Sequence, residues 1–180
     1  MNKCRTQITC ALTGCKYNSA CCDMTNGETY CTRDKVEFVV DNETGVSGGA
    51  IHARHFLSDG AYLKMNTVEF DDNDAKKNGG AIASIYDGVI DVDNGTFTSN
   101  IAGQNGGAIY VDSGSLVTIG KGLFINNSAE NGGAIYVKDD TTIGADQLNV
   151  AEFNYNSAEN GGAVYVEDGS LKVKAANFVA

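Results

Sequence analysis

Gly106-Gly107-Ala108-Ile109 is one of five nearly identical phrases in this chain, and their recurrence decides the fold. The other four phrases occupy residues 48–51, 79–82, 132–135 and 161–164, the last with Val in place of Ile. Phenylalanine keeps the same rhythm, since the spacing from Phe38 to Phe178 is 140 residues over five steps, or 28 per repeat. A fixed internal period is typical of a solenoid, in which each unit buries its apolar face against its neighbours.

One period shows which solenoid to expect. The segments Ala-Ile-Tyr-Val (108–111), Ser-Leu-Val-Thr-Ile (115–119) and Leu-Phe-Ile (123–125) are β-prone, and the turn residues Asp-Ser-Gly and Gly-Lys-Gly separate them. Hairpins would need two-residue turns and would not repeat the same residues every 28 positions. The sequence therefore predicts an all-β fold, a right-handed parallel β-helix of about five coils.

Stacking of equivalent residues, one coil about 4.8 Å above the next, predicts four columns. An interior aromatic column contains Phe70, Phe97, Phe124 and Phe153, and an interior aliphatic column contains Ile51, Ile82, Ile109, Ile135 and Val164. The neighbouring column faces outward by the period of two and contains His52, Ala83, Tyr110, Tyr136 and Tyr165. A corner ladder of side-chain amides contains Asn78, Asn105, Asn131 and Asn160, beside paired glycines that permit backbone angles closed to other residues.

All six cysteines lie within the first 31 residues, which separates a cysteine-rich head or cap, residues 1–35, from the repeat domain, residues 36–180. One interpretation of the head is a single structural zinc held by Cys10, Cys15, Cys21 and Cys31. The alternatives are three disulfide bridges, or free and intermolecular thiols. Because no apolar secretory signal follows the first charged residues, zinc is the favoured interpretation. In either case we expect the head to cover the first coil.

Charge narrows the range of partners. The chain carries 13 basic and 23 acidic residues, a net charge of −10, and the excess of acid lies after residue 40. An acidic body repels phosphate backbones, which argues against nucleic-acid binding. No run of about 18 apolar residues is present, so the sequence predicts no transmembrane helix.

Other candidate sites have simpler interpretations. The only two histidines, His52 and His55, are three residues apart on a predicted strand and should point to opposite faces, which disfavours a shared metal. The acidic clusters at 71–74 and 91–95 lack the spacing of a calcium-binding EF-hand loop, so we expect solvated turn carboxylates. Many β-helices cleave polysaccharides, but no arginine follows Arg54 and the acidic residues recur with the repeat instead of forming a unique cluster.

The pairing of Phe-x-x-Asn with Gly-Gly-Ala-(Ile/Val) resembles the polymorphic outer-membrane protein repeats of bacterial autotransporter adhesins, across residues 36–180. The resemblance implies a β-helical passenger for attachment or display at the cell surface and brings no catalytic residue. Residues 10–31 resemble a short bacterial family of unknown function with four cysteines. The matching positions are Cys10, Cys15, Tyr17, Asn18, Cys21 or Cys22, Thr29 and Cys31.

Three functional hypotheses follow from these patterns. The first is a non-enzymatic structural or adhesive module that binds a protein or glycan on the outward column of Tyr110, Tyr136 and Tyr165, because exposed aromatic rings suit flat ligands. The second is end-to-end self-assembly of copies through open β-helix ends, in a filament or particle. The third is a β-helical polysaccharide lyase or hydrolase.

Overall fold

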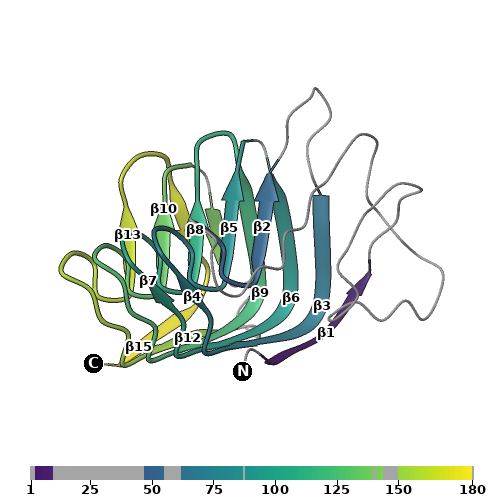
Figure 1. Cartoon of the computed structure of the whole chain (residues 1–180), viewed down its shortest axis with the longest axis horizontal. Helices are drawn as coiled ribbons and strands as arrows, with labels where there is room; N and C mark the ends of the chain where they lie inside the picture. The colour runs from purple at the N-terminus through teal and green to yellow at the C-terminus, as the bar shows by residue number, and fades with distance from the viewer. Residues whose placement is uncertain are drawn as a thin grey trace.

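The computed structural model describes residues 3–9, 47–54, 62–86, 88–139, 141–143 and 150–179, which form a parallel β-solenoid with no helix among them (Figure 1). The predicted all-β parallel architecture is confirmed. The predicted boundary near residue 35, the four proposed zinc ligands Cys10, Cys15, Cys21 and Cys31, and the segment that resembles the four-cysteine family lie outside the described residues.

The strands fall into three described sheets. The long sheet has the order β1-β3-β6-β9-β11-β14, with β12 pairing β9 and β15; its strands are β1 (Lys3–Thr9), β3 (Tyr62–Asp71), β6 (Val89–Thr98), β9 (Leu116–Ile125), β11 (Thr141–Ile143), β12 (Ala151–Asn154), β14 (Leu171–Val173) and β15 (Ala176–Val179). The second sheet, which we call the glycine sheet because each strand follows a Gly-Gly-Ala phrase, has the order β13-β10-β8-β5-β2. Its strands are β2 (Ile51–Arg54), β5 (Ile82–Ile85), β8 (Ile109–Val111), β10 (Ile135–Val137) and β13 (Val164–Val166). The third sheet pairs β4 (Asp74–Ala75) with β7 (Ile101–Ala102).

Parallel bridges between equivalent residues of successive coils give the number of turns. Ser47 pairs with Asn78, and the pairing continues through Asn105 and Asn131 to Asn160. These bridges delimit four complete turns, and residues 160–179 begin a fifth. The expected number of about five coils therefore includes one that is only partly present among the described residues.

The interior columns lie where the repeat predicts them. Phe70, Phe97 and Phe124 are fully buried, and the rings of Phe97 and Phe124 stack with centroids 4.8 Å apart and planes within 4°. The isoleucines of the glycine sheet pair in register from Ile51 to Ile135 and join the same core. Stacking of identical side chains thus fills the solenoid with one continuous apolar cluster.

The sequence predicted a turn at Gly120-Lys121-Gly122. This prediction is wrong, because these three residues lie within the continuous strand β9. A Cβ atom on Gly122 would lie 2.6 Å from the Cε2 atom of Phe124. A Cβ atom on the equivalent Gly95 of β6 would lie at the same 2.6 Å from the Cε2 atom of Phe97. Glycine at these two positions leaves room for the rings of the aromatic column inside a continuous strand, whereas the equivalent position of β3 carries Val68.

The Gly-Gly corner needs both of its glycines for different reasons. The first has a positive φ in all five phrases, for example 65° at Gly106, a conformation that side chains disfavour. The second packs against the next coil, since a Cβ on Gly107 would lie 2.0 Å from the carbonyl oxygen of Gly133. In each coil that another coil covers, a side chain at either glycine would force the backbone to shift.

The Phe-x-x-Asn phrase forms the opposite corner. The residue before each asparagine has a positive φ, for example 54° at Ser99, and this turns the asparagine side chain into the interior. Asn100 is fully buried; its Nδ2 group donates to Asn127 Oδ1 at 2.9 Å and to the Phe70 carbonyl oxygen at 3.0 Å. This inner amide ladder contains Asn73, Asn100, Asn127 and Asn156.

Candidate ligand face on the glycine sheet

The predicted tyrosine column lies on the outer face of the glycine sheet, apart from the main core. Tyr136 pairs in register with Tyr110 and with Tyr165, and each adjacent pair of rings stacks with centroids 5.4 Å apart. Together with Ala83 the rings form a second cluster of buried residues, which Tyr165 joins from its edge. The predicted outward stacking is therefore confirmed.

The predicted exposure of this column is wrong for two of its three rings. Tyr110 and Tyr136 are each only 4% exposed, whereas Tyr165 is partly buried. Tyr136 stacks between the rings of Tyr110 and Tyr165, whereas Tyr110 has Ala83 as its other register neighbour. Acidic side chains accept hydrogen bonds at the hydroxyl ends, Asp112 from Tyr110 and Glu167 from Tyr136. Tyr110 and Tyr136 are therefore buried, and their ring faces are not open for a ligand to stack on.

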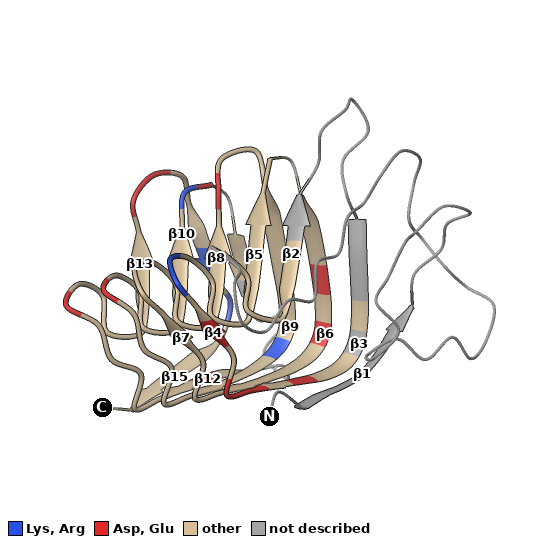
Figure 2. Ribbon diagram, in the orientation of Figure 1, with Lys and Arg blue, Asp and Glu red and all other residues tan. Residues whose placement is uncertain are grey.

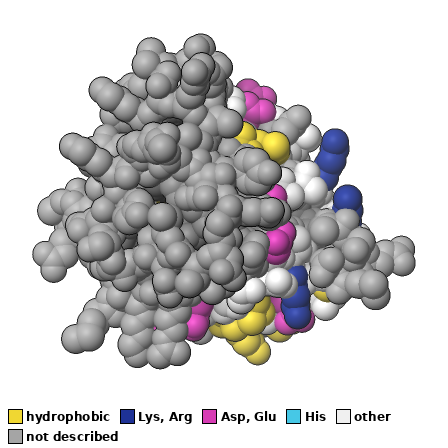
Figure 3. Space-filling model, turned by 90° about the vertical axis from the view of Figure 1, so that its right-hand side faces the viewer, with side chains coloured by type: hydrophobic (Ala, Val, Ile, Leu, Met, Phe, Trp, Pro, Cys, Tyr) yellow, Lys and Arg dark blue, Asp and Glu magenta, His cyan; other side chains and the backbone are white. Residues whose placement is uncertain are grey.

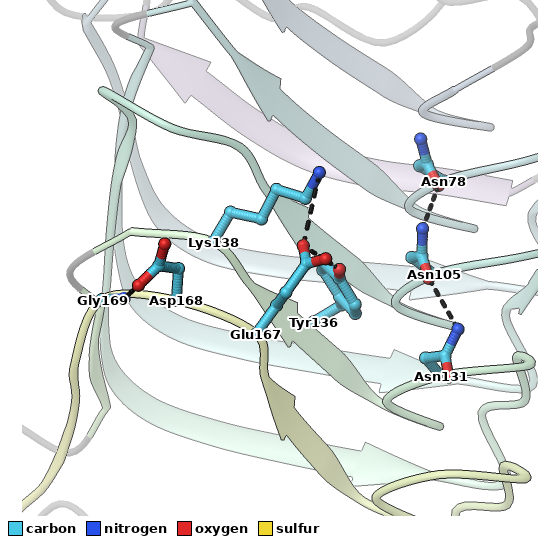
Figure 4. A network of polar contacts seen from close by, with 8 residues as sticks. All are labelled: Asn78, Asn105, Asn131, Tyr136, Lys138, Glu167, Asp168 and Gly169. Carbon is cyan, nitrogen blue, oxygen red and sulfur yellow. Dashed lines mark hydrogen bonds and ion pairs between the residues drawn. The ribbon is translucent and has the colours of Figure 1, made fainter.

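The hydroxyl ends lie in an acidic rim. The turns that follow β8, β10 and β13 carry several charged residues, as Figure 2 shows; they are Asp112, Lys138, Asp139, Glu167 and Asp168. Glu167 accepts a hydrogen bond from the Tyr136 hydroxyl and lies 3.3 Å from Lys138 Nζ (Figure 4). The backbone N–H of Gly114 donates to Asp139 Oδ2 at 2.5 Å, which ties neighbouring turns together.

The rim shifts the pKa values of its members. Burial raises the pKa of Tyr110 well above its usual value, and the charge and hydrogen bond of Asp112 raise it further. Burial together with Glu167 raises the pKa of Tyr136 in the same way. The hydrogen bond from Tyr136 lowers the pKa of Glu167, and Lys138 lowers it further. At neutral pH the rim therefore presents neutral phenols beside an ionised carboxylate.

Tyr86 belongs to this rim, although no sequence pattern singled it out. It follows β5 and is 57% exposed, and its backbone has a φ of 52°. It lies close enough to Tyr110 to raise the pKa of that residue. Its position in a turn, outside the repeat columns, explains why periodicity did not find it.

The corner ladder of Asn78, Asn105, Asn131 and Asn160 is confirmed and has a structural role, and Figure 4 shows its first three members. Asn105 Nδ2 donates to Asn78 Oδ1 at 2.9 Å, and Asn131 Nδ2 donates to Asn105 Oδ1 at 3.0 Å. The amides of this ladder are engaged by one another from turn to turn.

The remaining candidate residues do not converge on a site. His52 lies in the outer column opposite Ala83, and His55 is outside the described residues. Asp91 and Asp93 lie within β6, so their predicted place in a turn is wrong, whereas Asp72 and Asp74 are exposed near a corner. Among the described residues, no three His, Cys, Asp or Glu side chains are grouped as a metal site requires.

The described surface shows no large patch of one charge on the face drawn in Figure 3, where basic and acidic side chains lie among hydrophobic ones. The described ranges contain no helix that is long and apolar enough to cross a membrane.

Four segments of the chain match the Chlamydia polymorphic membrane protein repeat, at residues 67–85, 94–112, 121–138 and 151–167. Each of the four begins in the long sheet and reaches the glycine sheet of the following turn, as from Thr67 in β3 to Ile85 in β5. Four segments of the solenoid are therefore similar to polymorphic membrane protein repeats. The resemblance seen in the sequence is thereby confirmed, and each repeat joins one inner asparagine corner to one Gly-Gly corner. Comparison with the curated proteins and with the solved structures found no match.

Proposed function

We propose that this chain is a non-enzymatic surface module that binds a protein or glycan at the rim of the glycine sheet. The four polymorphic membrane protein repeats carry the proposal, because they form a scaffold in which most buried residues serve stacking. The description of these repeats as belonging to a membrane protein supports a location at the outer membrane or cell surface.

The rim combines groups that recognise polar ligands. Tyr86 offers an exposed ring, Tyr165 a partly exposed one, and Asp112 and Glu167 offer carboxylate acceptors beside them. Aromatic rings beside hydrogen-bonding groups suit sugars, and rings beside carboxylates suit cationic side chains of a protein. The buried Tyr110 and Tyr136 hold this arrangement rigid from below.

The backbone of Tyr86 supports its selection as a contact residue. A positive φ is a rare conformation for a bulky side chain and costs on the order of 1 kcal/mol or more. The exposed ring recovers little of that cost by packing within the chain. Strain kept at an exposed aromatic residue is more common at binding sites than elsewhere.

The test replaces Tyr86 by asparagine, which removes the ring and tolerates the same backbone conformation. Tyr155→Asn is the matched control, because Tyr155 is 61% exposed with a φ of 56° but follows β12, at the other corner of the coil. Both proteins are compared with the unmodified chain on a glycan array and on cultured epithelial cells. We expect Tyr86→Asn to weaken binding about tenfold or more, the effect of losing a central aromatic contact. Equal binding of both variants would overturn the choice of the rim.

End-to-end assembly is the second candidate function, and the exposed apolar side chains of the last described turn favour it. Phe178 is 58% exposed although it stacks on Phe153 at 4.8 Å, and Val179 is 47% exposed. Light scattering of residues 1–180 tests it, with Phe178→Asp as the variant that should prevent association. A monomer at all concentrations would exclude assembly through this turn.

Enzymatic cleavage of polysaccharides is the alternative to the non-enzymatic function that we propose. We expect no release of sugar from acidic polysaccharides, with or without added calcium. Turnover that a single carboxylate substitution in the rim abolishes, such as Glu167→Gln, would replace the binding proposal by an enzymatic one.

A structural zinc in the cysteine-rich head remains part of the proposal, and its four ligands lie outside the described residues. Metal analysis of protein purified under reducing conditions should find one zinc per chain. Three disulfides found by mass spectrometry of the unreduced protein would establish the alternative.

A further inference from the structure

The turns that lead into the corner ladder of asparagines carry a row of exposed side chains that changes from basic to acidic along the solenoid. We call this row the corner ridge; it contains Lys76, Lys77, Gln104, Glu130 and Glu159. Its members lie on successive turns, since Gln104 N–H donates to the Lys77 carbonyl oxygen at 2.7 Å and Glu159 N–H to that of Glu130 at 2.9 Å. In Figure 2 these turns stand in a row, with blue at one end and red at the other. The ridge therefore has a basic end and an acidic end.

The charges of the ridge are sorted by sign, whereas on the rim opposite charges pair between turns. Lys138 and Glu167 of the rim lie on successive turns, with Nζ and Oε2 3.3 Å apart. Glu130 and Glu159 of the ridge also lie on successive turns, about 4.8 Å apart along the stack, but with the same charge. Like charges at directly opposed positions destabilise a strand pair. Within the described part of the chain, no ion pair or side-chain hydrogen bond neutralises the four charged members of the ridge.

A row of charges sorted in this way is complementary to a reversed copy of itself. In a pair of chains related by a two-fold axis, the same patch of each copy faces the other. When the two solenoids are antiparallel, Lys77 faces Glu159 of the second copy, and Gln104 faces Glu130 of the second copy. A parallel arrangement would oppose lysine with lysine and glutamate with glutamate, which like-charge repulsion disfavours. The order of the charges thus selects the antiparallel orientation.

The column beside the ridge fits the same orientation. Its members are joined by parallel bridges from turn to turn and are Asp74, Ile101, Ser128 and Ser157. In the antiparallel pair Asp74 faces Ser157 of the second copy, so an acidic group meets a hydroxyl group and not another acid. Ile101, which is 49% exposed, faces Ser128 of the second copy and adds an apolar contact near the centre. The serine side chains are small enough for the two backbones to approach closely.

We propose that the corner ridge binds a second copy of this chain, side by side and antiparallel. Opposite charges meet at both ends of the contact, and Gln104 and Ile101 lie near its centre. The contact is separate from the rim of the glycine sheet and from the last described turn, so it depends on neither of the functions proposed above. Because each exposed ion pair contributes little, the dimer is weak, forms at high protein concentration and is sensitive to salt.

Sedimentation equilibrium of the full chain tests the proposal, with Phe178→Asp in every protein so that association through the last turn is removed. At about 0.1 M salt the parent protein should form a dimer. Its dissociation constant should rise about tenfold or more at about 1 M salt, because screening shortens the reach of exposed charges from about 10 Å to about 3 Å. A monomer at all concentrations would overturn the proposal, and so would a dimer that salt does not weaken.

Two charge-reversed variants identify the surface. Lys76→Glu/Lys77→Glu makes all four charged positions of the ridge acidic, and Glu130→Lys/Glu159→Lys makes them all basic, so each variant alone should be monomeric. An equimolar mixture of the two should form a heterodimer, which unfolded variants could not do. Lys121→Glu/Glu152→Lys is the matched control and should dimerise as the parent does, because both residues are exposed on the long sheet. Variants that still dimerise alone, or a mixture that stays monomeric, would place the contact elsewhere.

Chemical cross-linking tests the orientation. A carbodiimide joins lysine amines to carboxylates that lie in contact, and a mixture of isotope-labelled and unlabelled chains distinguishes links between copies from links within one copy. We expect links between copies from Lys76 or Lys77 to Glu159. Links between copies that involve only residues outside the ridge would contradict the antiparallel arrangement.

Discussion

Replacing Asn100 by alanine should be among the most damaging single changes in the solenoid. The side chain is fully buried and makes four hydrogen bonds. Its Oδ1 atom accepts from the backbone N–H and the Nδ2 of Asn73, at 3.1 and 2.8 Å, and its Nδ2 donates to the Phe70 carbonyl and to Asn127. Alanine retains none of these bonds.

The loss of stability in Asn100→Ala depends on which hydrogen-bonding partners of Asn100 are left unsatisfied. Asn127 Oδ1 still accepts from the backbone N–H of residue 100 at 3.0 Å, so it is not orphaned. Both donors of Asn73, itself only 4% exposed, lose their acceptor, and the Phe70 carbonyl loses this donor. At about 1–3 kcal/mol for each of these three buried groups, we expect a loss of about 3–9 kcal/mol. That is a large part of the stability of a typical domain.

Urea unfolding followed by circular dichroism measures this loss, with Asn105→Ala as the matched control from the same turn. Asn105 also belongs to a ladder, but it is partly exposed and makes only two side-chain hydrogen bonds with its ladder neighbours. Water replaces part of what is lost there, so we expect about 1 kcal/mol. Equal losses for the two variants would refute the argument that burial makes the inner ladder essential.

Three further predictions use pairs of equivalent positions or a single hydroxyl. Gly107→Ala should prevent folding or cost more than about 3 kcal/mol, because its Cβ would lie 2.0 Å from a carbonyl oxygen; Gly162→Ala, with 3.6 Å to the nearest atom, should change the free energy of unfolding by less than about 0.5 kcal/mol. Phe124→Ala should cost about 3–5 kcal/mol in urea unfolding, and Phe178→Ala, at a 58% exposed position, far less. Because the pKa of Tyr136 is raised on folding, its contribution to stability is present below its ordinary value of 10.0 and is lost as the pH rises above it. Tyr136→Phe should therefore reduce the alkaline loss of stability, measured by urea unfolding between neutral and alkaline pH; an unchanged slope would contradict the shift.

The columns could be predicted because a parallel coil stacks equivalent residues, and this depends on the period alone. The phenylalanine rings and the ladder through Asn78 lie where the repeat places them. The inner ladder through Asn100 recurs equally clearly in the sequence, but its role depends on a positive φ at Ser99, which turns the side chain inward. No pattern of residue types reveals that angle.

The errors have a common physical origin. The alternation of side chains along a strand places Tyr110 on the outer face, but it does not show how much of the ring the stacked neighbours cover. Glycine at position 122 is typical of a turn, yet here it makes room for Phe124 inside a strand. Both outcomes depend on contacts between turns that a single repeat does not contain. The rim at Tyr86 was missed because that residue lies outside every column.

The inner amide ladder also affects how the chain folds. Its bonds join residues 27 to 32 positions apart, in every turn to which they belong. Each completed turn thus offers the same set of donors and acceptors to the next, and one more turn costs the same loop closure as the one before it. Folding can advance as templated growth, one turn after another, and the number of turns can change without a change in the rules that add them.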